Sequence, residues 1–477
     1  MPPESDPGAW GEGGRTRVRL NTAKGSQRSP YGSWRRYQAS LRRRDVRARR
    51  RRRVLRGVVT FALLLAVSVA AYHFIWPVLR GSDGTLRFRA DHEAAAHTGS
   101  TPAPWGGFER WSRHGVVDAL RRNGVSRLPE SGMEVVRDGH SYRIETSLRS
   151  NLQGYLDALM AKSIAVQAGV VVMEPCTGRV LAMSGKGAPP GVCPASGVVY
   201  PAASVFKIVT AAAAMEVCDM VPGSPLTYRG RKHTLYKYQL KEKRTKWTRT
   251  VSLKESFADS INPVFGKLGA NHIGDGLLRA YATGFGYNQR FDFEFPVAAS
   301  VAPVEDDGFF LAETASGFNK RTLMSPLHGA ALVSAVLNDG ILPEPVAISQ
   351  VVRDDGLVVY AARLESAGQV AESRTCEAVR EMMEETVSSG TARRYFTGRG
   401  LDPILRHLTI GGKTGSISNL AGDIRYDWFV GFGENAVGES VAVAVVVGHG
   451  ELLGTRSMEY AGEALKKYFQ KSGLEKP

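Results

Sequence analysis

The chain has few cysteines, and what is missing around them excludes several kinds of protein. Four cysteines in 477 residues are too few for a disulfide-stabilised scaffold. Their spacings contain no Cys-x-x-Cys pair, so the sequence offers neither a zinc knuckle nor a thioredoxin-like redox motif. No Cys/His cluster has metal-ligand spacing, and none of the ten histidines belongs to a recognisable motif. The sequence therefore indicates no metal site.

Acidic residues are scarce at the start of the chain, where nearly all of the net charge of +16 is found. Residues 1–56 contain 17 Lys and Arg against 4 Asp and Glu, so the rest of the chain is close to neutral. Charge alone is a weak indicator of nucleic-acid binding, and no nucleic-acid partner is expected. The Gly, Ser, Pro and Arg composition predicts a disordered basic tail that suits anionic membrane lipids.

Charged residues are absent from 57–79, a run of 23 residues rich in Val, Ala, Leu and Phe. As a helix the run would be about 34 Å long, which is enough for a hydrocarbon core of about 30 Å. A cleaved signal peptide has a shorter apolar stretch and a brief basic region. The pattern therefore predicts a single transmembrane anchor, with the arginine-rich tail in the cytoplasm and the rest of the chain outside.

Hydrophobic patterns divide the remaining chain into a linker with a short pedestal at 80–140 and a large domain at 141–477. A hairpin is predicted around Asp138-Gly139. In the large domain the expected helices are 148–164 and 457–470, and the expected strands are 166–173, 180–183, 407–410, 426–432 and 441–447. The middle, about 200–400, reads as mostly helical. The prediction is an α/β fold of the α+β type, with an antiparallel sheet sandwiched by helices and an all-helical subdomain.

The exterior of a membrane is oxidising, so paired cysteines are permitted there. Cys176 and Cys193 flank the second early strand and form the most plausible pair. Cys218, at the end of an apolar helix, is expected to be an inert core thiol.

Ser204 and Lys207 lie three residues apart in a predicted helix from Pro201 to about Val217, so they share one face. Lys207 is the only charged residue between positions 201 and 215, amid Ala, Val, Phe, Ile and Met. Burial in such a helix lowers the pKa of the lysine toward the range of a general base. A neutral amine beside a hydroxyl is the arrangement of an activated serine nucleophile. A lysine that extends from a surface helix is the alternative.

Two further strings gain meaning from their context. Lys413-Thr414-Gly415 follows a predicted strand, where a glycine permits the close approach of a ligand and the lysine and hydroxyls can hold a carboxylate. Ser260-Ile-Asn262 taken alone could simply cap the helix that begins near Pro263.

The three strings together, in this order, resemble the motif set of penicillin-binding proteins and active-site-serine β-lactamases. Three other stretches are similar to the penicillin-binding protein transpeptidase family: an opening hairpin at 170–183, a helix start at 322–330 and a strand at 427–432. The resemblance covers roughly 141–470 and implies a β-lactamase/transpeptidase-like fold. It implies no metal and no cofactor.

By this resemblance Ser204 would attack a D-Ala-D-Ala bond of a peptidoglycan stem peptide and form an acyl-enzyme. Lys207 would accept the proton of Ser204, and Ser260 would relay a proton to the leaving amine. The substrate would be held by Asn262, Lys413, Thr414, Gly415 and Ser416. The backbone N–H groups of Ser204 and Ser416 would form the oxyanion hole.

The resemblance implies an anchored, monofunctional D,D-transpeptidase in the bacterial cytoplasmic membrane, with its catalytic domain outside and covalently inhibited by β-lactams. Its expected partners are stem peptides, β-lactams, membrane lipids and other cell-wall synthesis proteins. Residues 81–140 are too few for a glycosyltransferase domain. The motifs leave open a D,D-carboxypeptidase, in which water replaces the acceptor amine. A membrane β-lactam sensor and an inactive scaffold are further alternatives.

Overall fold

The structure is a computed structural model, and it describes residues 110–125, 132–305, 307–396 and 402–470. All of these lie in one compact unit that begins at Trp105. In the described residues no helix has the length and apolar character needed to cross a bilayer. The predicted tail at 1–56 and the predicted anchor at 57–79 lie outside the described residues.

A five-stranded sheet forms the centre of the domain, and every neighbouring pair in it is antiparallel. The strand order is β13-β14-β15-β3-β4, with β13 at one edge. The β15–β3 pair joins a strand from the C-terminal part of the domain sequence to one from its N-terminal part. The strands are β3 (Gln167–Met173), β4 (Val180–Lys186), β13 (Thr409–Ser418), β14 (Arg425–Glu434) and β15 (Ser440–His449). The five strands expected from the sequence are therefore confirmed.

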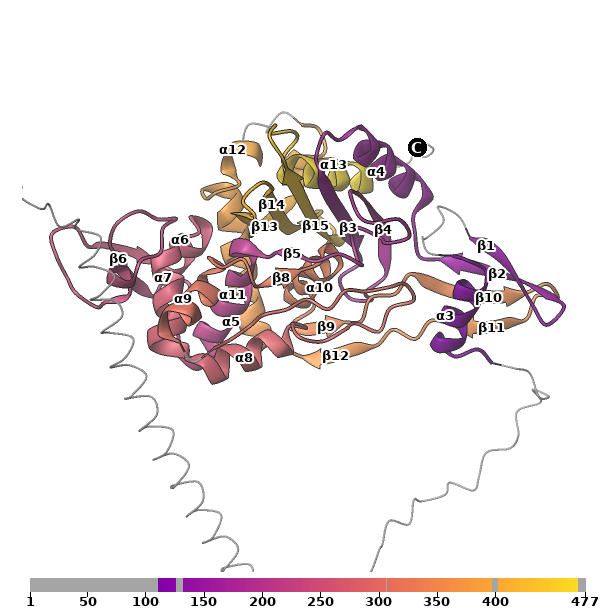
Figure 1. Cartoon of the computed structure of the whole chain (residues 1–477), viewed down its shortest axis with the longest axis horizontal. Helices are drawn as coiled ribbons and strands as arrows, with labels where there is room; N and C mark the ends of the chain where they lie inside the picture. Colours follow the sequence, from indigo (N-terminus) through magenta and orange to yellow (C-terminus); the bar gives the residue numbers. More distant parts are fainter. Residues whose placement is uncertain (1–109, 126–131, 306, 397–401, 471–477) are drawn as a thin grey trace, which may run out of the picture. The chain divides into compact units, whose positions relative to one another are not determined.

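Helices cover both faces of this sheet (Figure 1). Along β15, Val443 and Val445 face the core shared with α4 (Ser150–Lys162) and α13 (Ser457–Phe469). The alternate residues Ala442 and Ala444 belong to the opposite core, against which α10 (Pro326–Leu337) packs. This period of two is that of a strand buried on both faces, and it confirms the predicted sandwich of helices around an antiparallel sheet.

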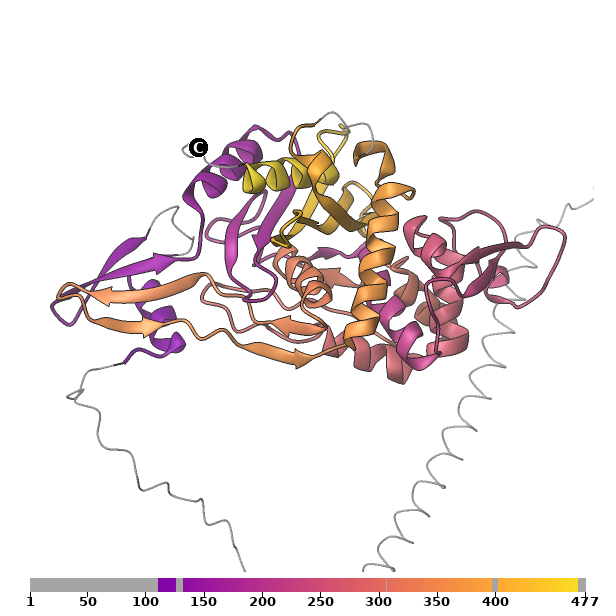
Figure 2. The same cartoon turned by 180° about the vertical axis from the view of Figure 1, so that it is seen from behind.

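A largely helical region is built from residues between 203 and 388, at the β13 edge of the sheet (Figures 1 and 2). The long α11 packs against β13, α5 and α6. The helices of this region are α5 (Lys207–Val217), α6 (Leu253–Ala258), α7 (Asn262–Lys267), the π-helix η4 (Leu268–Ile273), α8 (Asp275–Gly284), α9 (Gly308–Ser316) and α11 (Ser373–Ser388). The expectation of an all-helical subdomain was wrong in one respect, because a hairpin of β6 (Pro225–Tyr228) and β7 (Arg249–Ser252) projects from it.

A second sheet has the order β1-β2-β10-β11 and packs near α3 (Arg113–Arg122). The predicted hairpin is present as β1 (Met133–Arg137) and β2 (His140–Thr146), joined by Asp138 and Gly139, both with positive φ. Its partners β10 (Ile348–Arg353) and β11 (Val358–Ala361) fall in the stretch expected to be mostly helical. That expectation was wrong here: valines and isoleucine on either side of Asp-Asp-Gly favour a hairpin.

The predicted boundary after residue 140 falls just inside β2, after its first residue. Because β2 also pairs with β10, hydrogen bonds link the two sides of that boundary to the large domain. The remaining short elements are β5 (Tyr200–Pro201), β8 (Leu323–Met324), β9 (Ile341–Pro343), β12 (Ser366–Gln369), α12 (Arg393–Phe396) and the 3-10 turns η2 (Ala203–Phe206), η3 (Lys237–Leu240) and η6 (Leu405–His407).

The four cysteines are unpaired, so the pairing of Cys176 with Cys193 was wrong. The two residues lie beyond opposite ends of β4, a strand of seven residues. At about 3.3 Å per residue the strand alone separates its ends by roughly 20 Å, whereas a disulfide requires Cα atoms within about 7 Å. Cys376 is buried, and burial raises the pKa of its thiol to about 12.

Candidate active site

Ser204 lies in a tight 3-10 turn that immediately precedes α5, rather than in the α-helix itself as the sequence suggested. Its neighbour Ala203 has a φ of 50°, a conformation that is rare for residues with a Cβ atom. Gly317, at the end of α9, packs directly on this turn: a Cβ there would lie 1.9 Å from the carbonyl oxygen of Ala203. The close approach of two backbones therefore fixes the position of the serine hydroxyl.

Lys207 is the first residue of α5, and none of its surface is exposed. Its Nζ lies 2.8 Å from the Oγ of Ser204 and 2.8 Å from the Oδ1 of Asn262. The third partner is the carbonyl oxygen of Ser316, at the end of α9. Three segments of the chain thus converge on one amine.

Burial lowers the pKa of Lys207 well below its ordinary value, and the positive charge of Lys413 lowers it further. No carboxylate among the described residues offsets these effects. A neutral amine has two N–H groups and one lone pair. The oxygens of Asn262 and Ser316 can only accept, so they take both N–H groups and leave the lone pair facing the hydroxyl of Ser204.

Ser260 and Asn262 lie at the junction of α6 and α7, and both are almost completely buried. Ser260 has a φ of 55°, so the chain turns sharply there before α7 begins at Asn262. The junction is held by a hydrogen bond of 2.7 Å that the Asn262 N–H donates to the carbonyl oxygen of Lys232. The imidazole of His233 bonds the backbone of Ser260, and its pKa is lowered by partial burial and by the charges of Lys207 and Lys413.

Lys413 lies on the edge strand β13 and is completely buried, with its Nζ 5.4 Å from the ring centre of Phe257. Burial lowers its pKa to about 7, while the carboxylate of Asp259 acts in the opposite direction. Near neutral pH the ammonium and the amine are therefore both populated. A lysine of this kind would gain its proton fully when an anionic group binds beside it.

The next residues of β13 lie against the 3-10 turn that holds Ser204. A Cβ placed on Gly415 would lie 3.3 Å from the backbone nitrogen of Ser204, so only a small residue fits this closely. The hydroxyl of Thr414 lies 2.6 Å from that of Thr391, and the hydroxyl of Ser416 accepts a hydrogen bond from Arg425. The structure thus places Ser416 beside the same cleft edge.

The geometry brings all three sequence strings together in one site: by direct hydrogen bonds for Ser204, Lys207 and Asn262, and by packing and electrostatics for the others. Among the described residues no group of three or more His, Cys, Asp or Glu is arranged to hold a metal ion. A serine with a buried amine beside it and a lysine on an edge strand can carry out acyl transfer on a substrate that bears a carboxylate.

The family model of the penicillin binding protein transpeptidase domain matches residues 168–471. The chain belongs to the penicillin-binding protein transpeptidase family. No curated protein matches the sequence at a significant level.

Solved structures of penicillin-binding proteins share the fold. The D,D-transpeptidase domain of a peptidoglycan glycosyltransferase from Eggerthella lenta is 26% identical, with a TM-score of 0.55 over 70% of this chain and 84% of that one. Penicillin-binding protein A of Mycobacterium tuberculosis, solved as a ceftriaxone acyl-enzyme, is 22% identical, with a TM-score of 0.56 over 75% and 85%. Penicillin-binding protein 3 of M. tuberculosis, complexed with ampicillin, is 19% identical, with a TM-score of 0.58 over 72% and 80%.

Sequence reasoning missed several residues of this candidate site. Ser316 acts through a backbone carbonyl, which any residue could supply, so no side-chain pattern signals it. Gly317 ends α9 in the left-handed conformation, and a glycine after a helical run is a recognisable helix stop. Its packing against Ala203 was not predictable from that signal. His233 and Thr391 come from segments that no motif marks.

Proposed function

We propose that this penicillin-binding protein is a peptidoglycan D,D-transpeptidase, a serine acyltransferase that cross-links stem peptides through a D-Ala-D-Ala acyl-enzyme. The observation that supports the proposal best is the environment of Lys207. A buried amine with two acceptor oxygens and one hydroxyl around it is suited to remove a proton from Ser204.

In the first step the Oγ of Ser204 attacks the carbonyl carbon between the two D-alanines, and its proton moves to Lys207. The backbone N–H groups of Ser204 and Ser416 stabilise the oxyanion of the tetrahedral intermediate. Ser260 relays a proton to the nitrogen of the terminal D-alanine as the C–N bond breaks. The ester of Ser204 and one free D-alanine result.

Substrate is held along β13 and by the start of α7. Lys413, with the hydroxyls of Thr414 and Ser416, binds the terminal carboxylate of the donor. Asn262 hydrogen-bonds an amide of the acyl chain, and Gly415 leaves room for the substrate backbone. In the second step an amine of another stem peptide attacks the ester and releases Ser204.

Solved acyl-enzymes of similar proteins support the proposal that β-lactams react with this site. Penicillin-binding protein A of M. tuberculosis is described as an acyl-enzyme with ceftriaxone, imipenem and penicillin G. By likeness we propose that β-lactams acylate Ser204. A fluorescent penicillin should then label the wild-type chain and fail to label Ser204→Ala. Undiminished labelling of a folded Ser204→Ala protein would assign the nucleophile elsewhere.

Product analysis tests the reaction itself. We would incubate the full-length chain with a stem-peptide donor that ends in D-Ala-D-Ala, with and without a second peptide that carries an acceptor amine, and identify products by mass spectrometry. A cross-linked dimer is expected. Trimmed peptide alone, in the presence of acceptor, would identify a D,D-carboxypeptidase and reject the transpeptidase.

The predicted anchor at 57–79 leads us to propose a bacterial cytoplasmic membrane location, with 1–56 inside and the catalytic domain outside. In this arrangement 80–140 is the linker and pedestal, and other cell-wall synthesis proteins are candidate partners. Protease added to spheroplasts should digest the domain and leave a small N-terminal fragment. A mature N-terminus near residue 75 or beyond would identify a cleaved signal peptide instead.

A further inference from the structure

The segment 229–249, from the end of β6 to the first residue of β7, carries nine Lys and Arg and a single acidic residue, Glu242. We call it the basic loop. Lys232 is paired with Asp259. The other eight cations have no ion pair to a carboxylate in the described part of the chain. Outside the tail, the chain is close to charge balance, so this concentration of cations creates a strong local positive potential.

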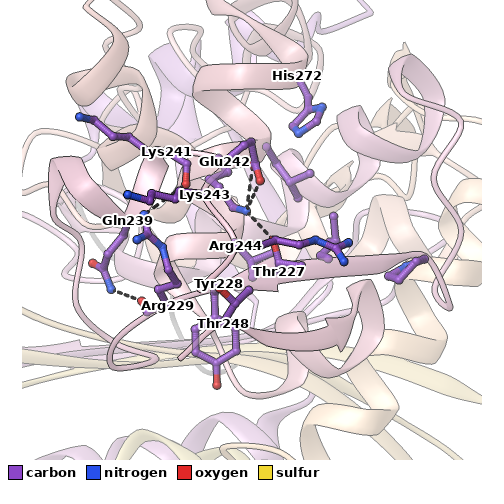
Figure 3. Close-up of a pocket in the computed structure, with 15 residues that line it drawn as sticks. Thr227, Tyr228, Arg229, Gln239, Lys241, Glu242, Lys243, Arg244, Thr248 and His272 are labelled. Atoms are coloured by element: carbon purple, nitrogen blue, oxygen red, sulfur yellow. Dashed lines mark hydrogen bonds and ion pairs between the residues drawn. The ribbon is translucent and has the colours of Figure 1, made fainter. Parts of the chain in front are cut away.

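A pocket of about 330 Å³ lies between β6, the basic loop and the helices that follow Asn262 (Figure 3). Its floor is Lys267, which is 7% exposed and whose Nζ lies 2.9 Å from Glu242 and 3.2 Å from the hydroxyl of Thr227. Glu242 neutralises that one cation. Four more line the pocket without an acidic partner among the described residues: Arg229, Lys241, Lys243 and Arg244.

Part of the loop that forms the pocket is organised by hydrogen bonds around the buried side chain of Gln239. Gln239 is 1% exposed; it donates to the carbonyl oxygen of Arg229 at 2.7 Å and accepts from the N–H of Tyr236 at 2.8 Å. The guanidinium of Arg229 donates to the carbonyl oxygen of Tyr238 at 2.6 Å. Because this framework orders the backbone around Arg229 and Gln239 before any ligand arrives, binding an anion costs less ordering entropy than on a loop without these bonds.

We propose that the pocket and the basic loop bind the phosphate ester groups of an anionic wall polymer. The four cations that line the pocket without an acidic partner call for a polyanion, and each phosphate diester of such a polymer carries one full negative charge and two non-bridging oxygens that accept hydrogen bonds from Lys and Arg. Thr227, Tyr228 and Thr248 also line the pocket. The exposed rings of Tyr236 and Tyr238, stacked at 5.8 Å, lie on the same loop.

The position of the loop associates it with the site of Ser204 and not with the start of the domain. α3, the first described element after the predicted anchor, lies at the opposite end of the domain from β6 and β7 (Figures 1 and 2). The pocket is also close to the catalytic cleft, because α7 begins at Asn262 and ends at Lys267 and is therefore about 9 Å long. A polymer bound there would hold wall material beside Ser204. This binding does not depend on which reaction the serine performs.

Lysine footprinting on the full-length chain resolves the loop from the basic tail, which also attracts anions. The chain, in phosphatidylcholine nanodiscs, is titrated with poly(glycerol phosphate), and acylation of each lysine by an amine-reactive reagent is measured by mass spectrometry. Lys241, Lys243 and Lys246 should be protected. The exposed Lys162, on α4, should not. Protection that is equal at all four lysines, or absent from the loop, would overturn the proposal.

Matched variants set the size of the effect. Lys241→Gln, Lys243→Gln and Arg244→Gln combined should raise the polymer concentration that half-protects Lys246 by about a hundredfold, since each cation contributes about fivefold near an anionic surface. The control combines Arg121→Gln, Arg122→Gln and Lys162→Gln; it removes the same charge and should change nothing. Glu242→Gln, which frees Lys267, should lower the concentration about fivefold. Equal loss in the control triple variant would overturn the assignment.

Two further ligands test the chemistry. Poly-glutamate of equal charge should protect the loop only at much higher concentration. Equal protection would show that the loop binds any polyanion through charge alone, and would overturn the proposal of a phosphate site. Phosphatidylglycerol vesicles present the same phosphate ester as a lipid headgroup. Protection by these vesicles but not by poly(glycerol phosphate) would assign the loop to the membrane and reject the polymer.

Discussion

Replacing Lys207 by arginine separates the two roles that a cation beside Ser204 can have. Arginine keeps a positive charge in the cleft but cannot lose its proton near neutral pH. In the native site the amine is completely buried and its pKa is lowered, with the oxygens of Asn262 and Ser316 as fixed acceptors. If Lys207 is the general base, Lys207→Arg must lose that function even if it folds.

The magnitude follows from the chemistry. Positioned general acid–base catalysis contributes about 10²–10⁴-fold, which corresponds to about 3–5 kcal/mol of transition-state stabilisation. We therefore expect the acylation rate to fall by at least that range. The guanidinium is also larger than the ammonium and would occupy a completely buried position, where the ring centre of Phe265 lies 5.5 Å from Nζ. Some loss of thermal stability is expected as well.

The assay is the rate of covalent labelling by a fluorescent penicillin, with the thermal midpoint of each variant as the folding control. Lys207→Cys, alkylated with 2-bromoethylamine, restores an amine at nearly the same position and should recover most of the rate. A folded Lys207→Arg protein that acylates within about tenfold of wild type, well short of the general-base range, would refute the reasoning and assign the proton to another group.

Two further predictions concern stability. Gly317→Ala places a Cβ 1.9 Å from the carbonyl oxygen of Ala203. Its free energy of unfolding, measured by chemical denaturation, should fall by about 1–3 kcal/mol more than that of Gly191→Ala, the control at a positive-φ glycine with open space around it. Equal losses in the two variants would contradict the packing. His328 is buried, its ring bonds the carbonyl oxygen of Phe285, and burial lowers its pKa to about 4. In the unfolded chain the imidazole takes up a proton below about pH 6.5, whereas in the folded chain it does so only near pH 4. The free energy of unfolding should therefore fall by up to about 3 kcal/mol as the pH is lowered from 6.5 toward 4. His328→Gln keeps a donor and should flatten this part of the pH profile, whereas an unchanged slope would assign it to other groups.

Much of the central sheet, and the first hairpin of the second sheet, were predictable because their signals are local. Asp138-Gly139 favours a tight hairpin turn, and the apolar runs of β3, β14 and β15 are typical of strands buried on both faces. The stretch 348–361 was misassigned, since its hairpin turn Asp354-Asp355-Gly356 is short and lies within the part of the sequence, about 200–400, that was expected to be mostly helical.

The sequence alone determined which residue types carry the chemistry. Ser204, Lys207, Asn262 and Lys413 stand in an order and in local patterns that identify the family, and the charge of residues 1–56 follows from composition. Such features depend on neighbours in the chain, so they can be read without a fold.

Only the tertiary structure decided how these residues act on one another. The carbonyl of Ser316, 109 residues from Lys207, completes the environment of the amine, and Gly317 fixes the turn before Ser204. The pKa of Lys413 likewise depends on burial by helices distant in sequence. A backbone carbonyl can be supplied by any residue, so no side-chain pattern predicts the role of Ser316. Desolvation is the sum of many contacts between residues distant in sequence, so no local pattern predicts the pKa of a buried lysine.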